Sequence, residues 1–382
     1  MTATAIEKDR LRTWIEVDKK ALAHNYELFR GLAGPGCRLM AVAKSNAYGH
    51  GLYDYAPVME RLGADWLGVD SIVEGATLRD IGIQKPILVL GYTLPARFPE
   101  AARHRVSLTV SSFETLAALK SSEAVSRIKV HIKIDTGLHR QGFLPDEVAG
   151  VIQILRRELP HLQVEGLYTH FAVAKDPQDP VYTREQIRHF TQSAEAFWAA
   201  GYRPLRHIGA TAGAINHPEA RFEMIRIGIG LAGLWPSPEM KAALDKNLEL
   251  KPVLSWRTII SEIKSLPAGA GISYDLTEKL GRDSTVGICP IGYWHGFPRS
   301  LSRVGEVLVR GRRAKVLGAV TMDMIVVDLT GIQNVSVGDI VTLIGREGGD
   351  EITAYEVAQK AGGSYYEVLT RLNPLIQKFY LD

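Results

Sequence analysis

The chain has 382 residues, of which 46% are hydrophobic and 23% charged, and its formal net charge is +3. These values are typical of a folded protein too long for one ordinary core, so we expect two domains. The charges are scattered rather than gathered into a basic stripe, which excludes the usual pattern of nucleic-acid binding. No stretch approaches the roughly 20 apolar residues of a membrane helix, and the first residues contain no apolar signal segment. Cys37 and Cys289 lie far apart without metal-ligand spacing, so we expect free thiols, no metal, and a cytoplasmic location.

The first 235 residues alternate between short apolar runs and amphipathic segments. A strand is predicted at residues 14–18 and a helix at 19–32. Eight more strands are predicted at 39–43, 66–69, 87–90, 106–110, 128–134, 163–168, 206–209 and 223–227, with helical patterns between them. Alternating β and α units predict a parallel sheet, and eight units within about 190 residues favour a (β/α)8 barrel of the TIM type. An open doubly wound sheet is the competing fold.

After Pro236 the pattern changes. Residues 236–252 are polar and helix-like, and the β-type runs beyond them follow one another without intervening helices. These runs lie at 253–265, 285–291, 304–310, 314–318, 324–329 and 339–344, and two short helices are predicted at 353–361 and 364–372. The sequence therefore predicts an α/β protein with a barrel over 12–245 and a mostly β domain over 246–382. The strand at 13–18 can pack with the β domain.

Polar side chains follow the carboxyl ends of several predicted barrel strands, which is where barrel proteins bind ligands. Lys44 follows the first strand, Arg140 the fifth, His170 the sixth and Thr211 the seventh, while Arg226 lies in the last. A lone lysine, histidine or arginine at such a position usually has a structural explanation. Their joint placement on one rim indicates a ligand site.

The segment GIGLAG at 228–233 matches the spacing G-x-G-x-x-G of dinucleotide-binding folds. Trp235 and Pro236 interrupt the chain where the required helix would run, so we reject a dinucleotide site. Glycine-rich backbone can still bind a single phosphate through its N–H groups.

The segment AVAKSNAYGHG at 41–51 resembles the pyridoxal 5'-phosphate attachment site of the alanine racemase family. Further segments occur in family order over nearly all of the chain: KIDTGLHRQG at 133–142, THF at 169–171, RIGIGLAGL at 226–234, ISYD at 272–275, PIGYWHG at 290–296 and TMD at 321–323. The resemblance implies a barrel followed by a β domain, a homodimer with shared active sites, and interconversion of L-alanine and D-alanine, which supplies D-alanine for peptidoglycan.

The resemblance also implies a role for each matching residue. Lys44 would attach the cofactor and act as the base for D-alanine, and Tyr274 of the other subunit would be the base for L-alanine. His170, coupled to Arg226, would supply the positive charge that lowers the pKa of Tyr274. The remaining matches imply cofactor binding by Tyr48, Thr211, Gly228 and Ile229, substrate binding by Arg140 and Met322, carbamylation of Lys133, and control of substrate access by Tyr293.

Three positions depart from the family pattern. Ala210 replaces a common asparagine, and Ala232 and Pro374 each replace a common tyrosine. These departures leave open a racemase that acts on serine or on several small amino acids. A decarboxylase that uses the same cofactor is less favoured because Arg140 would hold the substrate carboxylate and Tyr274 supplies a base. A non-catalytic pyridoxal-phosphate-binding protein is disfavoured because such proteins consist of the barrel alone.

Overall fold

The computed structural model describes residues 8–176, 180–244 and 248–382. The chain divides into two compact units. The barrel unit comprises Lys20–Ala47 and Leu52–Pro252, and the β unit comprises residues 8–19, Tyr48–Gly51 and Val253–Asp382. No helix within the described ranges is both long enough and apolar enough to cross a membrane.

The barrel unit is built on a sheet of eight parallel strands in the order β8-β7-β6-β5-β4-β3-β2-β9. Neighbours in sequence are neighbours in the sheet, and the last strand, β9, pairs with the first, β2. The Arg226 N–H on β9 donates to the Gly209 carbonyl just after β8 (2.9 Å), so the two ends of the sheet also meet. This arrangement is a (β/α)8 barrel, and the open doubly wound alternative is excluded. The strands are β2 (Arg38–Val42), β3 (Trp66–Val69), β4 (Ile87–Val89), β5 (Ser107–Val110), β6 (Lys129–Lys133), β7 (Gln163–Tyr168), β8 (Leu205–His207) and β9 (Met224–Ile227).

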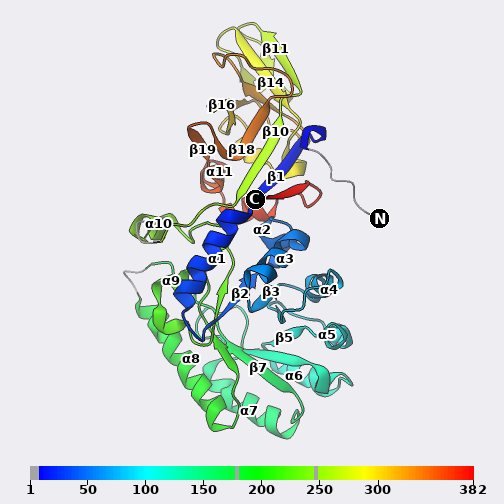
Figure 1. The fold of residues 1–382 in the computed structure, drawn as a ribbon, viewed down its shortest axis with the longest axis vertical. Coiled ribbons are helices and arrows are strands. Elements are labelled where there is room, and N and C mark those ends of the chain that lie inside the picture. Colours follow the sequence, from blue (N-terminus) through cyan, green and yellow to red (C-terminus); the bar gives the residue numbers. More distant parts are fainter. Residues whose placement is uncertain (1–7, 177–179, 245–247) are drawn as a thin grey trace. The chain divides into compact units, whose positions relative to one another are not determined.

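The helices of the barrel unit lie around the outside of these strands (Figure 1). Local sequence sets where several of them begin: Ser71 and Ser112 accept backbone N–H groups at the starts of α4 and α6. The helix predicted at 19–32 is confirmed as α1. The helices are α1 (Lys19–Ala33), α3 (Leu52–Leu62), α4 (Ile72–Asp80), α5 (Phe98–His104), α6 (Phe113–Lys120), α7 (Val148–Arg157), α8 (Val181–Ala199), α9 (Thr211–Asn216) and α10 (Pro238–Leu244). The segment labelled α2 (Lys44–Tyr48) is a left-handed turn that follows β2.

The β unit contains a mixed sheet in the order β11-β14-β17-β16-β15-β18-β10-β1-β20. Its first strand, β1 (Thr13–Asp18), lies between β10 and β20, antiparallel to the former and parallel to the latter. The predicted run at 253–265 is two strands rather than one, β10 and β11, separated at Ile260–Ser261. The other elements are β12 (Gly271–Ile272), β13 (Glu278–Lys279), β14 (Ser284–Cys289), β15 (Glu306–Val309), β16 (Arg312–Leu317), β17 (Ile325–Asp328), β18 (Ile340–Glu347), β19 (Asp350–Ile352), α11 (Ala354–Ala361), α12 (Tyr365–Thr370) and β20 (Lys378–Leu381), with β10 (Leu254–Ile259) and β11 (Glu262–Leu266).

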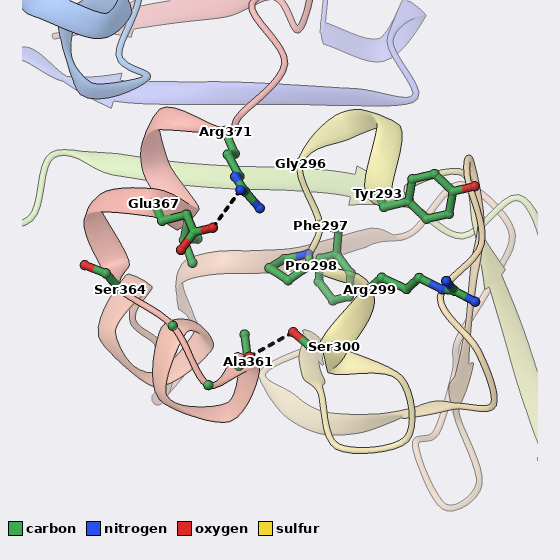
Figure 2. A pocket seen from close by; sticks show the side chains of 13 residues that line it. Tyr293, Gly296, Phe297, Pro298, Arg299, Ser300, Ala361, Ser364, Glu367 and Arg371 are labelled. Carbon is green, nitrogen blue, oxygen red and sulfur yellow. Dashed lines mark hydrogen bonds and ion pairs between the residues drawn. The ribbon is translucent and has the colours of Figure 1, made fainter.

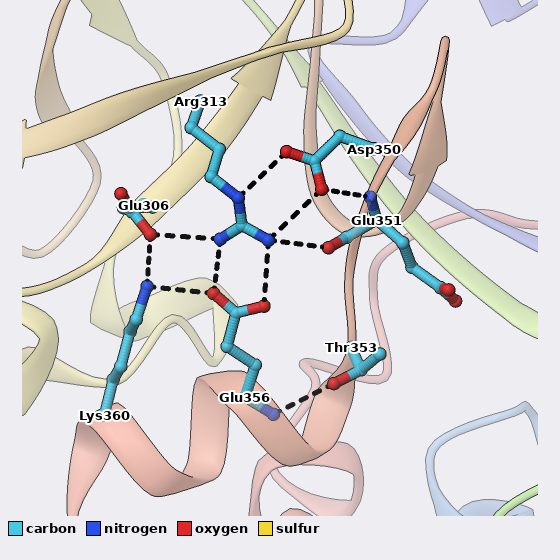
Figure 3. A network of polar contacts seen from close by, with 7 residues as sticks. All are labelled: Glu306, Arg313, Asp350, Glu351, Thr353, Glu356 and Lys360. Atoms are coloured by element: carbon cyan, nitrogen blue, oxygen red, sulfur yellow. Dashed lines mark hydrogen bonds and ion pairs between the residues drawn. The ribbon is translucent and has the colours of Figure 1, made fainter.

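A network of charged side chains joins strands and helix at one surface of the β unit (Figure 3). Arg313 on β16 contacts the carboxylates of Glu306, Asp350 and Glu356, and Lys360 contacts Glu306 and Glu356. These hydrogen bonds raise the pKa of the Arg313 guanidinium. A network of this kind fixes α11 against the sheet more effectively than isolated surface ion pairs, each of which contributes about 0–1 kcal/mol.

Candidate active site

Lys44 follows β2 directly and begins a left-handed turn. The four residues after it, Ser45–Tyr48, all have positive φ values between 51° and 56°. None is glycine, and L-residues lose about 1–2 kcal/mol each in this conformation. The Lys44 side chain is 38% exposed, and its Nζ lies 3.8 Å from Asp70 Oδ1. A backbone strained over four residues next to one amine indicates a site whose geometry is held by its surroundings.

Arg226 is buried inside the barrel and contacts two imidazoles. It donates to His207 Nδ1 at 3.0 Å and lies 3.2 Å from His170 Nδ1, and other N–H groups reach the carbonyls of Thr169, His207 and Ile208. Burial lowers the pKa of Arg226 to about 10, which leaves it charged at neutral pH. Because a guanidinium only donates, each imidazole nitrogen facing it must be an acceptor.

His170 is therefore held neutral. Burial, followed by the charges of Arg226, Arg140, Lys133 and Lys44, lowers the pKa of His170 to about 3. The expectation that His170 itself supplies a positive charge is wrong, because four nearby cations oppose its protonation. The charge lies on Arg226, and the His170 proton lies on Nε2.

The same reasoning extends across the barrel interior. With Nδ1 of His207 an acceptor, its Nε2 carries the proton and donates to His131 Nδ1 at 2.8 Å. His131 then carries its proton on Nε2, which lies 3.6 Å from Glu165 Oε2. Burial lowers the pKa values of both His131 and His207. The sequence reasoning missed this chain, although His131 in the run IKVHIKI is a polar residue in a strand that is buried after its first residue.

Lys133 and Arg140 are associated with the loop that follows β6. Lys133 is buried, and its Nζ donates to Gln141 Oε1 at 3.3 Å. Burial, then the charges of Arg140 and Arg226, lowers the pKa of Lys133 to about 8. The backbone N–H of Arg140 donates to Asp135 Oδ2 at 3.0 Å, so Asp135, which sequence reasoning also missed, shapes the loop that presents the exposed guanidinium.

The glycine-rich segment after β9 faces the start of α9. The Gly230 N–H donates to Thr211 Oγ1 at 3.4 Å, and Thr211 is the first residue of α9. A Cβ on Gly230 would lie within 2.7 Å of atoms of both Phe29 and Thr211, so only glycine fits there. Gly228 and Ile229 are buried immediately before it. Backbone N–H groups and a hydroxyl in this arrangement are suited to a phosphate.

Tyr48, Tyr274, Tyr293 and Met322 belong to the β unit. Tyr48 is largely buried, with its ring 6.3 Å from that of Tyr366, and burial raises the pKa of its phenol. Tyr274 is 72% exposed and follows Ser273, whose φ is 64°.

Tyr293 and Met322, although distant in sequence, lie in adjacent loops. The N–H groups of Tyr293 and the next residue donate to the carbonyls of Thr321 and Met322, both at 3.0 Å. A Cβ on Gly292 would come within 2.5 Å of those carbonyl groups, so glycine permits the close approach. Both side chains are exposed, Tyr293 at 44% and Met322 at 54%.

A cavity of about 810 Å³ adjoins Tyr293 (Figure 2). Tyr293 and Arg299 extend from one side of it, and Ser364, Glu367 and Arg371 come from the segment at α12. Arg371 pairs with Glu367 at 2.9 Å.

The structure thus divides the expected site residues between two groups. The barrel unit holds Lys44, Lys133, Arg140, His170, Thr211, Arg226, Gly228 and Ile229, and the β unit holds Tyr48, Tyr274, Tyr293 and Met322. Direct contacts link Arg226 to His170 and place Tyr293 beside Met322.

Comparison with known sequences identifies the family. Residues 17–236 match the family model "Alanine racemase, N-terminal domain", and residues 253–380 match "Alanine racemase, C-terminal domain". The chain belongs to the alanine racemase family. The alanine racemase of Symbiobacterium thermophilum is 41% identical over 371 residues, covering 96% of this chain and 97% of that protein. The alanine racemase of Methanococcus maripaludis is 37% identical, covering 96% and 98%.

Solved structures of the family have the same fold. The alanine racemase of Bacillus anthracis with bound L-Ala-P superposes with a TM-score of 0.92 at 34% identity, covering 99% of this chain and 96% of that one. The alanine racemase of Clostridium difficile 630 gives 0.90 at 32% identity, covering 97% and 96%. Both units of this chain therefore resemble alanine racemases in fold as well as in sequence motifs.

Proposed function

We propose that this protein is a pyridoxal-phosphate-dependent racemase that interconverts L-alanine and D-alanine by a two-base mechanism. The observation that carries the proposal is the rim of the barrel, where a half-exposed amine at Lys44 accompanies a buried Arg226–His170 pair in a chain with full-length family similarity. The assignment of individual roles rests on the matching motifs.

The donor set in the barrel unit fits this cofactor. Lys44 offers an amine to a carbonyl carbon, and the Thr211 hydroxyl with the N–H groups of Gly228 and Ile229 suits a phosphate. Tyr48 would add a phenol to the phosphate contacts. When bound, pyridoxal phosphate withdraws electrons from the substrate Cα and so acidifies its proton.

Arg226 would face the pyridine nitrogen as a donor. Its guanidinium cannot accept a proton, and it is fixed by contacts to His170 and His207. A ring nitrogen hydrogen-bonded to this group stays unprotonated, which limits how far negative charge is stored on the ring. Proton transfer at Cα is favoured over reactions that need long-lived charge on the cofactor.

Two bases are required on opposite faces of Cα. We assign Lys44 to the D-enantiomer and Tyr274 to the L-enantiomer. His170, neutral and protonated on Nε2, would donate a hydrogen bond to the phenolate of Tyr274. The positive charge of Arg226, which contacts His170, strengthens this hydrogen bond and so favours the ionised form of Tyr274. Arg140 would hold the substrate carboxylate with the Met322 backbone, and Tyr293 would control access.

We infer a homodimer in which each active site takes Tyr274 from the second copy. Supporting this, Tyr274, Leu276, Trp294 and Met322 are between 54% and 72% exposed in the β unit. Tyr274 and Leu276 are two residues apart, and the Trp294 N–H donates to the Met322 carbonyl, so these side chains form two exposed pairs of the kind that an interface covers.

Lys133 is the proposed site of carbamylation. Its pKa of about 8 leaves a substantial fraction of neutral amine, which can add CO2 and lose a proton to give a carbamate. The resulting anion would relieve the repulsion from Arg140 and Arg226, the charges that lower its pKa.

A racemase for serine or for several small amino acids is the second candidate. Ala210, Ala232 and Pro374 each place a smaller or hydroxyl-free side chain where the family commonly has a larger polar one.

The product D-alanine would serve peptidoglycan synthesis. We place the reaction in the cytoplasm, and two buried free cysteines are compatible with a reducing environment.

The test is to incubate the purified protein and pyridoxal phosphate with L-alanine and with L-serine separately. Chiral chromatography then quantifies each D-isomer over time. We expect D-alanine to form faster than D-serine. Faster formation of D-serine would favour the second candidate, and formation of neither would overturn the proposal.

A further inference from the structure

The left-handed turn after Lys44 is held by one carboxylate from another part of the barrel. The Ser45 N–H donates to Glu74 Oε1 at 2.8 Å. Two further hydrogen bonds act on the turn: Ala47 N–H to the Ala43 carbonyl, and Leu52 N–H to Asn46 Oδ1, both at 2.9 Å. Those two partners lie within or next to the turn. Glu74, by contrast, lies on α4, so it fixes the turn relative to the neighbouring strand.

The second oxygen of Glu74 fixes the segment after β3. Oε2 accepts the Asp70 N–H at 2.7 Å and the Ser71 N–H at 3.4 Å. A single carboxylate therefore connects the ends of β2 and β3, the two strands that carry Lys44 and Asp70 to the rim. The charge-assisted hydrogen bonds it accepts are stronger than bonds between neutral groups.

Both partners of the Lys44–Asp70 contact depend on this connection. The Ser45 N–H belongs to the peptide group that follows the Lys44 Cα, so its orientation sets the direction in which the Lys44 side chain leaves the backbone. The Asp70 N–H belongs to the residue whose Oδ1 lies 3.8 Å from Lys44 Nζ. Glu74 itself does not contact Nζ, and its influence passes through the backbone.

We propose that Glu74 is a positioning residue for the Lys44 amine, in addition to its part in capping α4. The proposal rests on the assignment of Lys44 as cofactor anchor and base. Ser71 and Glu74 form a reciprocal cap in which Ser71 Oγ accepts the Glu74 N–H at 3.3 Å. The cap alone would explain the Ser71 contact, but it does not require a bond from Glu74 to the loop of another strand.

The test compares Glu74→Gln with Ser71→Ala. Glutamine has the same shape but only one oxygen, so its NH2 group must face either the Ser45 N–H or the pair at Asp70 and Ser71. Ser71→Ala removes the cap hydroxyl and leaves both Glu74 oxygens in place. A Glu74→Ala variant is the third protein, because it lacks both side-chain oxygens and no reorientation of an amide can restore the hydrogen bonds.

Two measurements on the folded proteins decide whether Glu74 positions the Lys44 amine or only caps α4. Hydrogen–deuterium exchange resolved to single residues, without cofactor, should show the Ser45 amide exchanging at least tenfold faster in Glu74→Ala than in Ser71→Ala. In Glu74→Gln, either the Ser45 amide or the Asp70 amide should exchange faster by that factor, according to which of them faces the NH2 group. With cofactor, kcat for alanine should fall at least tenfold in the Glu74 variants with KM changed less than threefold, while Ser71→Ala keeps both near wild type.

Equal exchange and equal kcat in the Ser71 and Glu74 variants would show that Glu74 only caps α4, and would overturn the proposal. Altered exchange at Ser45 with no change in kcat would also overturn it. If the wild-type protein formed no D-alanine, the proposed function would fail, and the exchange comparison would still report whether Glu74 holds the turn.

Discussion

The two proposed bases lie in segments with similar backbone conformation but in very different surroundings. Lys44 precedes four residues with left-handed φ, and Tyr274 lies between Ser273 and Asp275, whose φ values are 64° and 59°. The Lys44 turn is held by Glu74 and lies in a unit with a buried polar interior, whereas Tyr274 is 72% exposed. The barrel unit therefore presents its base in a preformed site. The β unit presents its base on a surface, which suits a residue that completes a site on another chain.

The largest effect is expected from Lys44→Ala. Removing the amine should abolish both racemisation and covalent attachment of pyridoxal phosphate, because the proposed role of Lys44 as cofactor anchor and base requires an amine at this position of the rim. Borohydride reduction followed by peptide mass mapping measures the attachment, and Lys120→Ala on α6 is the matched control. A cofactor adduct on a different lysine would contradict the assignment.

Tyr274→Phe should have a smaller and one-sided effect. Loss of a positioned base typically costs a factor of about 10²–10⁴. The rate of Cα deuterium incorporation in D2O should fall by that factor for L-alanine and by much less for D-alanine. Equal losses for both enantiomers would refute the assignment of one base to each face.

The smallest effect concerns stability rather than rate, and it tests the polar interior of the barrel. Burial alone would raise the pKa of Glu165, but its contacts with His131, Ser107 and Lys129 outweigh burial and lower the pKa from 4.5 to about 2. A carboxyl with a lowered folded-state pKa stabilises the protein above pH 4.5, and this contribution is lost as the pH falls toward 2.

The lost contribution amounts to about 3 kcal/mol, since one pKa unit is about 1.36 kcal/mol. Urea unfolding at pH 6, 4 and 3 should show a steeper loss of stability in wild type than in Glu165→Gln. The exposed Glu195→Gln variant should follow wild type. Parallel curves for all three proteins would mean that the contacts of Glu165 do not stabilise its ionised form.

The sequence was sufficient for the sheet of the barrel because its strands are short apolar runs bounded by turn residues. The rim residues followed from topology, since parallel strands bring Lys44, His170 and Arg226 to one end. Short strands such as β12 and β19 were missed because two or three residues carry too little pattern, and β20 was missed because its pairing partner, β1, lies at the other end of the chain.

The left-handed turn could not have been predicted from local preference. Ser45, Asn46, Ala47 and Tyr48 each favour right-handed or extended backbone, and the opposite conformation depends on hydrogen bonds from outside the segment, above all from Glu74. The neutral state of His170 was likewise hidden, because it follows from the combined charge of residues on four different strands or loops.

The central claim is that each active site combines Lys44 of one chain with Tyr274 of another, and subunit complementation tests it most directly. Lys44→Ala and Tyr274→Phe are each inactive or nearly so with L-alanine. After the two variants are unfolded together and refolded, random pairing makes half of the dimers mixed, each with one intact site. We predict that the mixture regains about a quarter of wild-type activity, whereas activity no higher than that of the separately refolded variants would contradict a shared site.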